Sequence, residues 1–383
     1  AHTTADAAAL VELAAESVEE LDSSLEKLIE QLREQNLGYH YPVLRGADMP
    51  KVWNLRKAGL GLLSNVPGDA KPVAVVEDTA VDTDDLPQYI TEYDQILESM
   101  GLDSVYYAHA GSGELHIRPV LNLKTEAGQK QFREVAERVA QLVKKYRGSL
   151  SGEHGDGRLR GEFIAFMMGD KVARMFEDVK KTWDAQGIFN PGKIVHTTAM
   201  DTHLRYLPQQ KDAELNTVFD YSETRGFLRA AEMCNGSGDC RKSHLIGGTM
   251  CPSFQATRDE KDTTRARANI LREMLSHSHK DNPFDSPEIH EVMDLCLSCK
   301  GCKSECPSNV DISKLKAEFL QGYYDANGVP RRAQFFADFE KNQKRASALA
   351  PLSNFLTRTP GFSQLMKKTL GIHPRRSIPE VAS

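Results

Sequence analysis

The sequence lacks cysteine over its first 230 residues, and all seven cysteines lie between Cys234 and Cys306. A disulfide framework would spread its cysteines along the chain, so this distribution indicates a local metal site in a separate module. The 383 residues are enough for two or three domains that each bury a core, and we expect two.

Long apolar runs and an excess of basic residues are also missing. No run of about 18 apolar residues occurs, and the start AHTTADAAAL has no basic segment, so we expect neither a membrane span nor a signal peptide. The formal net charge of −6 argues against the clustered basic face of a nucleic-acid-binding protein. We therefore expect no nucleic-acid partner and a cytoplasmic location, either free or peripheral to the inner membrane face.

A third absence concerns phosphate binding. No G-x-G-x-x-G motif or P-loop opens a βαβ unit, and the nearest stretch, AGLGLLSN (58–65), lacks the third glycine and a following acidic residue for a ribose. The sequence therefore predicts no pyrophosphate site within this chain.

Hydrophobic periodicity predicts an α+β domain over residues 1–200, with an antiparallel sheet and helices on one sheet face. Two of its strands are joined across Gly111-Ser112-Gly113. The expected elements are helices at 6–36, 86–100 and 126–147 and strands at 71–78, 104–110 and 114–123.

The remainder is expected to be mostly helical. Residues 201–224 are polar and resemble a linker, and residues 225–328 form an all-α iron–sulfur domain in the prediction. Ser286-Pro287 and Asp311 are expected to begin two of its helices. The tail, 329–383, shows no clear fold of its own.

The stretch HAGSGELH (109–116) places two histidines at the ends of a hairpin. If the turn is 111–114, His109 faces His116 at chelating distance, and Tyr107 and Arg118 form the next pair on the same sheet face. Two ligands do not hold a divalent ion, so a plain surface or core histidine pair is the alternative.

A third ligand is available in SGEHGDGRLRGE (151–162), where Glu153 and His154 lie in a glycine-rich turn. Two imidazoles and one carboxylate leave open positions on a metal ion, which is typical of a catalytic site. The alternative is a polar turn with Glu153 solvated.

The run CLSCKGCKSECP (296–307) has the Cys-x2-Cys-x2-Cys-x3-Cys-Pro spacing of bacterial ferredoxins, in which the fourth cysteine reaches the other cluster. A zinc knuckle is the competing interpretation. On the crossed pattern, one [4Fe-4S] cluster has four ligands, which are Cys251, Cys296, Cys299 and Cys302.

The upstream half of the cysteine module is irregular, because Ser237 stands where a middle cysteine would be. Cys234, Cys240 and Cys306 are left with a fourth position that no cysteine fills. This second site holds a cluster with Ser237 or His244 as an odd ligand, a three-iron cluster, or nothing.

HAGSGELH, GEHGDG and FNPGKI together resemble the C-terminal domain of FAD-linked oxidases of the vanillyl-alcohol oxidase superfamily, over about residues 1–200. That group includes D-2-hydroxyglutarate, D-lactate and glycolate dehydrogenases, and its domain is a ferredoxin-like cap. The resemblance implies that a divalent ion, usually zinc, is held by His109, His116 and Glu153, with His154 as general base. Residues 225–325 resemble the α-helical ferredoxin domain of glycolate-oxidase-like and heterodisulfide-reductase-like proteins.

Further residues are candidates for substrate and flavin. Arg118 could pair with a substrate carboxylate, although the D-2-hydroxyglutarate enzymes carry asparagine there and a solvent-facing arginine is the alternative. Arg56 and Lys71 resemble carboxylate-binding positions of the family. Asn190 and Lys193 of NPGK resemble residues near the flavin, or else belong to an ordinary turn.

These expectations lead to an FAD-dependent dehydrogenase that oxidises a D-2-hydroxy acid by hydride transfer to flavin. Electrons would pass through an iron–sulfur cluster to a quinone or an electron-transfer protein. The rival is a non-catalytic iron–sulfur electron-transfer subunit. The resemblance also implies an N-terminal FAD-binding domain that this chain does not contain, and a homo-oligomer is compatible with the sequence.

Overall fold

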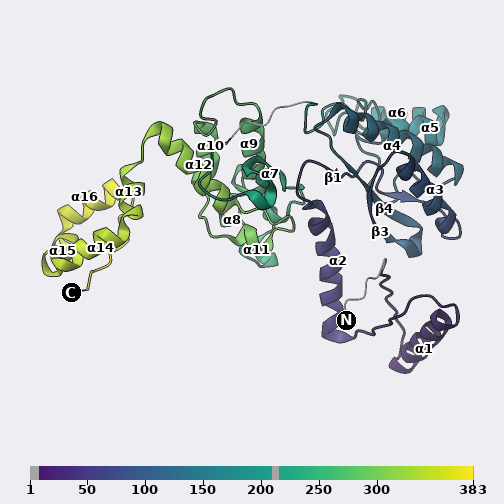
Figure 1. The fold of residues 1–383 in the computed structure, drawn as a ribbon, viewed down its shortest axis with the longest axis horizontal. Helices are drawn as coiled ribbons and strands as arrows, with labels where there is room; N and C mark the ends of the chain where they lie inside the picture. The colour runs from purple at the N-terminus through teal and green to yellow at the C-terminus, as the bar shows by residue number, and fades with distance from the viewer. Residues whose placement is uncertain (1–7, 209–214, 383) are drawn as a thin grey trace. The chain divides into compact units, whose positions relative to one another are not determined.

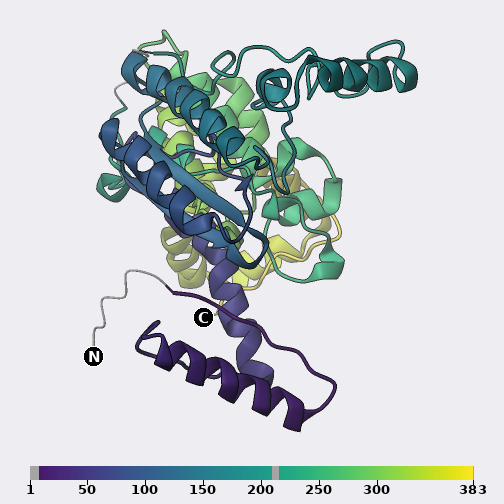
Figure 2. The ribbon, with the colours of Figure 1, turned by 90° about the vertical axis from the view of Figure 1, so that its right-hand side faces the viewer.

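The computed structural model describes residues 8–208 and 215–382. The chain divides into two compact units, residues 1–58 and 59–383. In the described part no helix has the length and apolar character needed to cross a membrane. Figures 1 and 2 show the ribbon in two views.

The first unit carries α1 (Val18–Glu34) and most of α2 (Met49–Ser64). The prediction of a helix from residue 6 was wrong over 8–17, while residues 6 and 7 lie outside the described range. The physical reason is Ser17, whose extended backbone and side chain cap the helix by accepting from the Glu20 amide at 3.1 Å.

The sheet of the second unit is centred on β4 (Glu114–Leu121). Three strands pair with it, all antiparallel: β1 (Lys71–Pro72), β2 (Thr79–Ala80) and β3 (Ser104–His109). The predicted continuous strand over 71–78 was wrong, because residues 73–78 follow no ladder even though Val75 and Val76 are fully buried. The apolar run in the sequence reflects burial of these valines, which does not require that they pair in a strand.

Two helices cover one face of this sheet, as predicted: α3 (Leu86–Ser99) and α4 (Glu126–Lys145). Figure 2 shows the two helices side by side against the strands. Leu115, Ile117 and Leu121 of β4 belong to their shared core. Because side chains alternate along a strand, Glu114, His116 and Arg118 lie on the opposite face.

The predicted register of the hairpin was wrong by two residues. His109 pairs with Glu114 and Tyr107 with His116, because a 3-10 turn over Ala110–Ser112 ends at Gly113 with φ of 74°. A Cβ on Gly113 would lie 1.9 Å from the Val81 carbonyl oxygen, so the turn requires glycine there. A shift of two residues leaves every side chain on its predicted face.

After the sheet the described chain is helical (Figure 1). Ser286 and Asp311 cap helices as predicted, accepting from the amides of Ile289 and Lys314. The helices up to residue 328 are α5 (Ile164–Met168), α6 (Asp170–Trp183), α7 (Phe227–Glu232), α8 (Pro252–Thr257), α9 (Thr264–Ser276), α10 (Pro287–Asp294), α11 (Gly301–Glu305) and α12 (Ile312–Asn327).

The tail, for which no fold was expected, forms four short helices. Only Ala350, Ser363 and Leu370 are buried within them, so these helices contribute little to a buried core. They are α13 (Arg331–Ala337), α14 (Phe339–Ala348), α15 (Ala350–Arg358) and α16 (Pro360–Leu370).

Candidate functional site

The polar face of β4 carries a compact group of possible metal ligands. One ligand atom each from His109, Glu114, His116 and Glu153 lies within 4.8 Å of the others, and Asp78, Glu153 and His154 form a second such group. The structure thus brings together the two hairpin histidines, the glutamate and the adjacent histidine that the sequence predicted.

His116 is a deeply buried member of this group, with only 4% of its surface exposed. Its Nδ1 lies 3.1 Å from the Glu77 carbonyl oxygen, which can only accept, so Nδ1 carries the proton. Its Nε2 therefore keeps a lone pair, and it lies 3.1 Å from Oε1 of Glu153. Burial lowers the pKa of His116, which keeps the ring neutral and able to bind a cation.

Asp78 positions the loop that carries Glu153 and His154. Its fully buried carboxylate accepts from the amides of Gly152, Glu153 and His154, at 3.1, 2.9 and 2.8 Å, and from the Ser151 hydroxyl at 2.6 Å. Burial would raise the pKa of Asp78, but these hydrogen bonds outweigh it and the pKa is lowered. The sequence analysis missed this residue, although its place after an apolar run was a usable signal.

His154 lies on the open side of the group and is stacked on His116, with ring centroids 5.3 Å apart. Its Nδ1 is 3.4 Å from Oε1 of Glu77, and its Nε2 is 3.3 Å from Oε1 of Glu153. In the tautomer whose Nδ1 donates toward Glu77, Nε2 is the basic atom. Proton acceptance by His154 is therefore geometrically feasible.

The sequence analysis also missed Glu114, which is only 4% exposed. Burial, and then the charges of Glu153 and Asp78, raise the pKa of Glu114 to about 7. The Nδ1 of the neutral His116 ring lies 3.0 Å from Oε1 of Glu114. A buried carboxylate among other carboxylates is unfavourable unless a cation compensates it or a proton neutralises it.

The carboxylates of this region, which are Glu77, Asp78, Glu114 and Glu153, outnumber its two arginines. Arg118 pairs with Glu77 at 2.5 Å, and Arg160 lies 3.4 Å from Asp78. Among the described residues of the group, Glu114 and Glu153 have no such basic partner, since both histidines near them can be neutral. Two uncompensated carboxylates beside two imidazoles are a donor set that fits a divalent ion.

The other predicted site residues are not members of this group of ligands. Lys71 is paired opposite Leu121, five residues along β4 from His116, or about 17 Å at ~3.4 Å per residue. Asn190 and Lys193 are exposed in the loop after α6, and Asn190 has a left-handed backbone. Arg56 lies on α2 in the first unit. Arg118 shares the face of His116, but its guanidinium is engaged by Glu77.

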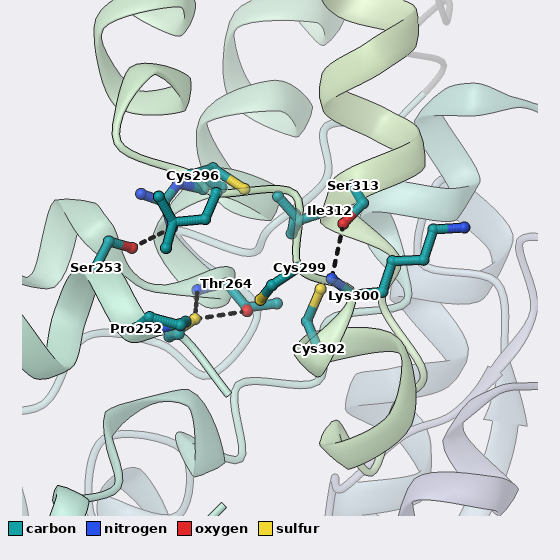
Figure 3. Close-up of a pocket in the computed structure, with 12 residues that line it drawn as sticks. Pro252, Ser253, Thr264, Cys296, Cys299, Lys300, Cys302, Ile312 and Ser313 are labelled. Carbon is teal, nitrogen blue, oxygen red and sulfur yellow. Dashed lines mark hydrogen bonds between the residues drawn. The ribbon is translucent and has the colours of Figure 1, made fainter. Parts of the chain in front are cut away.

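The cysteine module forms a second candidate site. Cys251, Cys296, Cys299 and Cys302 line one pocket, and they are the four cysteines grouped by the sequence analysis. Figure 3 shows Cys296, Cys299 and Cys302 around this pocket. Ser298 and Lys300, between the cysteines, have left-handed backbones that curl the loop.

Two features of this pocket bear on an iron–sulfur cluster. The Cys251 sulfur receives a hydrogen bond from the Thr264 amide at 3.0 Å, and burial raises the pKa of this thiol to about 11. The guanidinium of Arg267, which also lines the pocket, is almost fully buried and donates to Ser253 and to the Asp262 carbonyl. A buried cation and a donor to sulfur both favour an anionic thiolate cluster.

The remaining cysteines are Cys234, Cys240 and Cys306. Cys306 does not line the pocket, and it is close enough to Cys234 for that thiolate to raise its pKa after the effect of burial. Cys240 acts on Cys234 in the same way. The two predicted odd ligands are exposed, and His244 lies 2.8 Å from the Arg258 guanidinium.

Comparison with known proteins finds two family models that match different parts of the chain. Residues 1–194 match the family model "FAD linked oxidases, C-terminal domain", and residues 233–311 match "4Fe-4S dicluster domain".

Curated relatives include the D-2-hydroxyglutarate dehydrogenases of Escherichia coli (strain K12), 29% identical over 88% of this chain, and of Haemophilus influenzae, 29% identical over 95%. A D-lactate dehydrogenase of Anaerostipes hadrus is 32% identical over 46% of the chain and 37% of its own length. The chain spans 36% and 39% of the lengths of the two D-2-hydroxyglutarate dehydrogenases. With half of its residues matched by the first family model, the chain belongs to the FAD linked oxidases, as their C-terminal domain, followed by a 4Fe-4S dicluster domain.

Proposed function

We propose that this chain is the substrate-binding and electron-relay part of an FAD-dependent dehydrogenase that oxidises a D-2-hydroxy acid to the 2-oxo acid. The observation that carries the proposal is the convergence of His109, His116 and Glu153 beside His154. A non-catalytic electron-transfer subunit has no need of a buried, neutral imidazole facing a carboxylate and a second imidazole.

We propose that His109, His116 and Glu153 hold a divalent ion, for which zinc is the candidate implied by the family. Such an ion, when bound, supplies a Lewis acid that lowers the pKa of a substrate hydroxyl. His154 would accept the hydroxyl proton at Nε2, while Glu77 holds the proton on Nδ1. Asp78 keeps Glu153 and His154 in place through their backbone amides.

The substrate would be an acid of the D-2-hydroxyglutarate or D-lactate type, the compounds in the names of the relatives. Arg118 is our candidate for a substrate carboxylate, because it lies two residues from His116 on the same face of β4. A substrate carboxylate bound there would replace Glu77 as the partner of the Arg118 guanidinium. FAD, when bound, supplies the hydride acceptor.

For electron relay we propose a [4Fe-4S] cluster on Cys251, Cys296, Cys299 and Cys302. Cys234, Cys240 and Cys306 would hold the second cluster of the dicluster domain, with a fourth ligand that is not cysteine. The final acceptor would be a quinone or an electron-transfer protein, and a peripheral place at the inner membrane face would suit a quinone.

The test is reduction of the flavin in the flavin-loaded protein by D-2-hydroxyglutarate, D-lactate, D-malate and glycolate. We expect bleaching by at least one acid. We expect a loss of rate of about 10²–10⁴-fold in His154→Gln, because general-base catalysis contributes that much. The control is His203→Gln, an exposed histidine outside the group. No bleaching by any of the acids would instead support the electron-transfer subunit.

A further inference from the structure

Glu114 is buried among groups that give it no hydrogen bond. Neither of its carboxylate oxygens accepts a hydrogen bond from a residue that the structure describes. A buried carboxylate without hydrogen bonds costs far more free energy than a buried neutral polar group without them. The neighbouring loop nevertheless leaves space for the Glu114 side chain. A Cβ at position 152 would lie 3.1 Å from the Glu114 Cγ, so Gly152 provides this space.

The local cations are already engaged elsewhere. Arg118 pairs with Glu77, and Arg160 donates to the Gly155 carbonyl at 2.7 Å and contacts Asp78. The neighbouring imidazole of His116 offers its Nδ1 proton to the Glu77 carbonyl. A cation in the space between Glu114 and Glu153 is what would compensate the Glu114 carboxylate.

We propose that Glu114 is a fourth protein ligand of the divalent ion, so that the site is built from two histidines and two glutamates. This inference rests on the proposed function, because it concerns the same ion. Its geometric basis is that a Glu114 oxygen belongs to the group whose ligand atoms all lie within 4.8 Å of one another. His109, directly opposite Glu114 in the ladder, and His116, two residues along the strand, share its face.

A fourth protein ligand reduces the number of coordination positions that the ion has left for substrate. In a six-coordinate ion, four protein ligands leave two positions, which matches the hydroxyl and carboxylate oxygens of a single 2-hydroxy acid. The site would then select a chelating acid over a simple alcohol. It would also accept ions that favour six ligands, Mn²⁺ and Co²⁺, as well as Zn²⁺.

The competing role for Glu114 is that of a positioning residue, which would orient His116 through the 3.0 Å contact with Nδ1 without touching the ion. Loss of such an outer partner typically lowers metal affinity by about 10–100-fold. Affinity alone therefore does not distinguish the two roles, but the coordination number of the ion does.

The experiment uses the Co²⁺-loaded chain and the variant Glu114→Gln, with Glu162→Gln as a matched control in the same domain. Visible absorption and X-ray absorption report the coordination of Co²⁺, and titration reports its affinity. We expect Glu114→Gln to lose one oxygen ligand, to absorb more strongly as the coordination number falls, and to bind Co²⁺ roughly a hundredfold or more weakly. Glu162→Gln should match the original protein.

An unchanged cobalt spectrum in Glu114→Gln, at any affinity, would overturn the inference and leave the three-ligand site standing. If the original protein binds no divalent ion at all, the metal site of the proposed function fails together with the inference. Thermal unfolding of the metal-free proteins checks that the variant is folded. A glutamine should be tolerated, because it removes a buried charge while keeping the shape.

Discussion

At the scale of single residues, the donor set was predictable and its support was not. Histidines and a glutamate in short glycine-rich motifs are visible in a sequence. Asp78 acts through contacts made only after the chain folds, because it reaches residues more than 70 positions away. Glu114 looks like an ordinary polar hairpin residue until its burial is known.

Asp78→Ala should destabilise the protein and disable the loop of Glu153 and His154. Removing one member of a buried ion pair costs about 3–5 kcal/mol, and Arg160, 6% exposed, would lose its carboxylate. Urea unfolding measures the loss, with exposed Asp84→Ala as control. A difference between the two variants below about 1 kcal/mol would contradict the role given to Asp78, since surface changes usually stay within about 0.5 kcal/mol.

The same residue predicts a pH dependence. Because the pKa of Asp78 is lowered in the folded chain, its contribution is fully present above the unfolded value of about 3.9. It is lost as the pH falls through the folded pKa. The stability gap between the original protein and Asp78→Ala should therefore shrink as the pH falls below about 4.

At the scale of elements, alternation along β4 was the reliable part of the prediction. The faces of Glu114, His116 and Arg118 followed from the strand period, whereas the register depended on which residues formed the turn. The irregular segment 73–78 was not predictable from periodicity, because its valines are buried without pairing into a strand.

The turn itself can be tested with two glycines of the same hairpin. Gly113→Ala should destabilise the protein, since a positive φ costs a side-chain-bearing residue about 1–3 kcal/mol and the new Cβ would meet the Val81 oxygen at 1.9 Å. Gly111→Ala is the matched control, with nothing within 4 Å of its Cβ and no positive φ. Divalent-ion binding should fall in the first variant alone; equal behaviour of the two would contradict the observed turn.

At the scale of the whole second unit, the sheet domain and the helical domain are joined by charges. Asp69, just before β1, pairs with Arg229 of α7 through two hydrogen bonds of 2.7 and 2.8 Å. Lys124, just after β4, contacts both Asp69 and Glu232 at 3.2 and 3.0 Å. The Arg229 hydrogen bond lowers the pKa of Asp69, so this connection stays ionised at neutral pH.

In the helical domain, the proposed electron relay depends on how the cysteines divide between two sites. Cys251 lines the pocket with Cys296, Cys299 and Cys302, whereas Cys306, although part of the same sequence run, does not line it. Cys251→Ser should therefore remove or convert one [4Fe-4S] cluster, seen as lost iron and an altered electron paramagnetic resonance signal of the reduced protein. Cys306→Ser should leave that signal intact and affect only the second site. If the two variants lose the same signal, the crossed arrangement is wrong, and the four cysteines of the run bind one cluster between them.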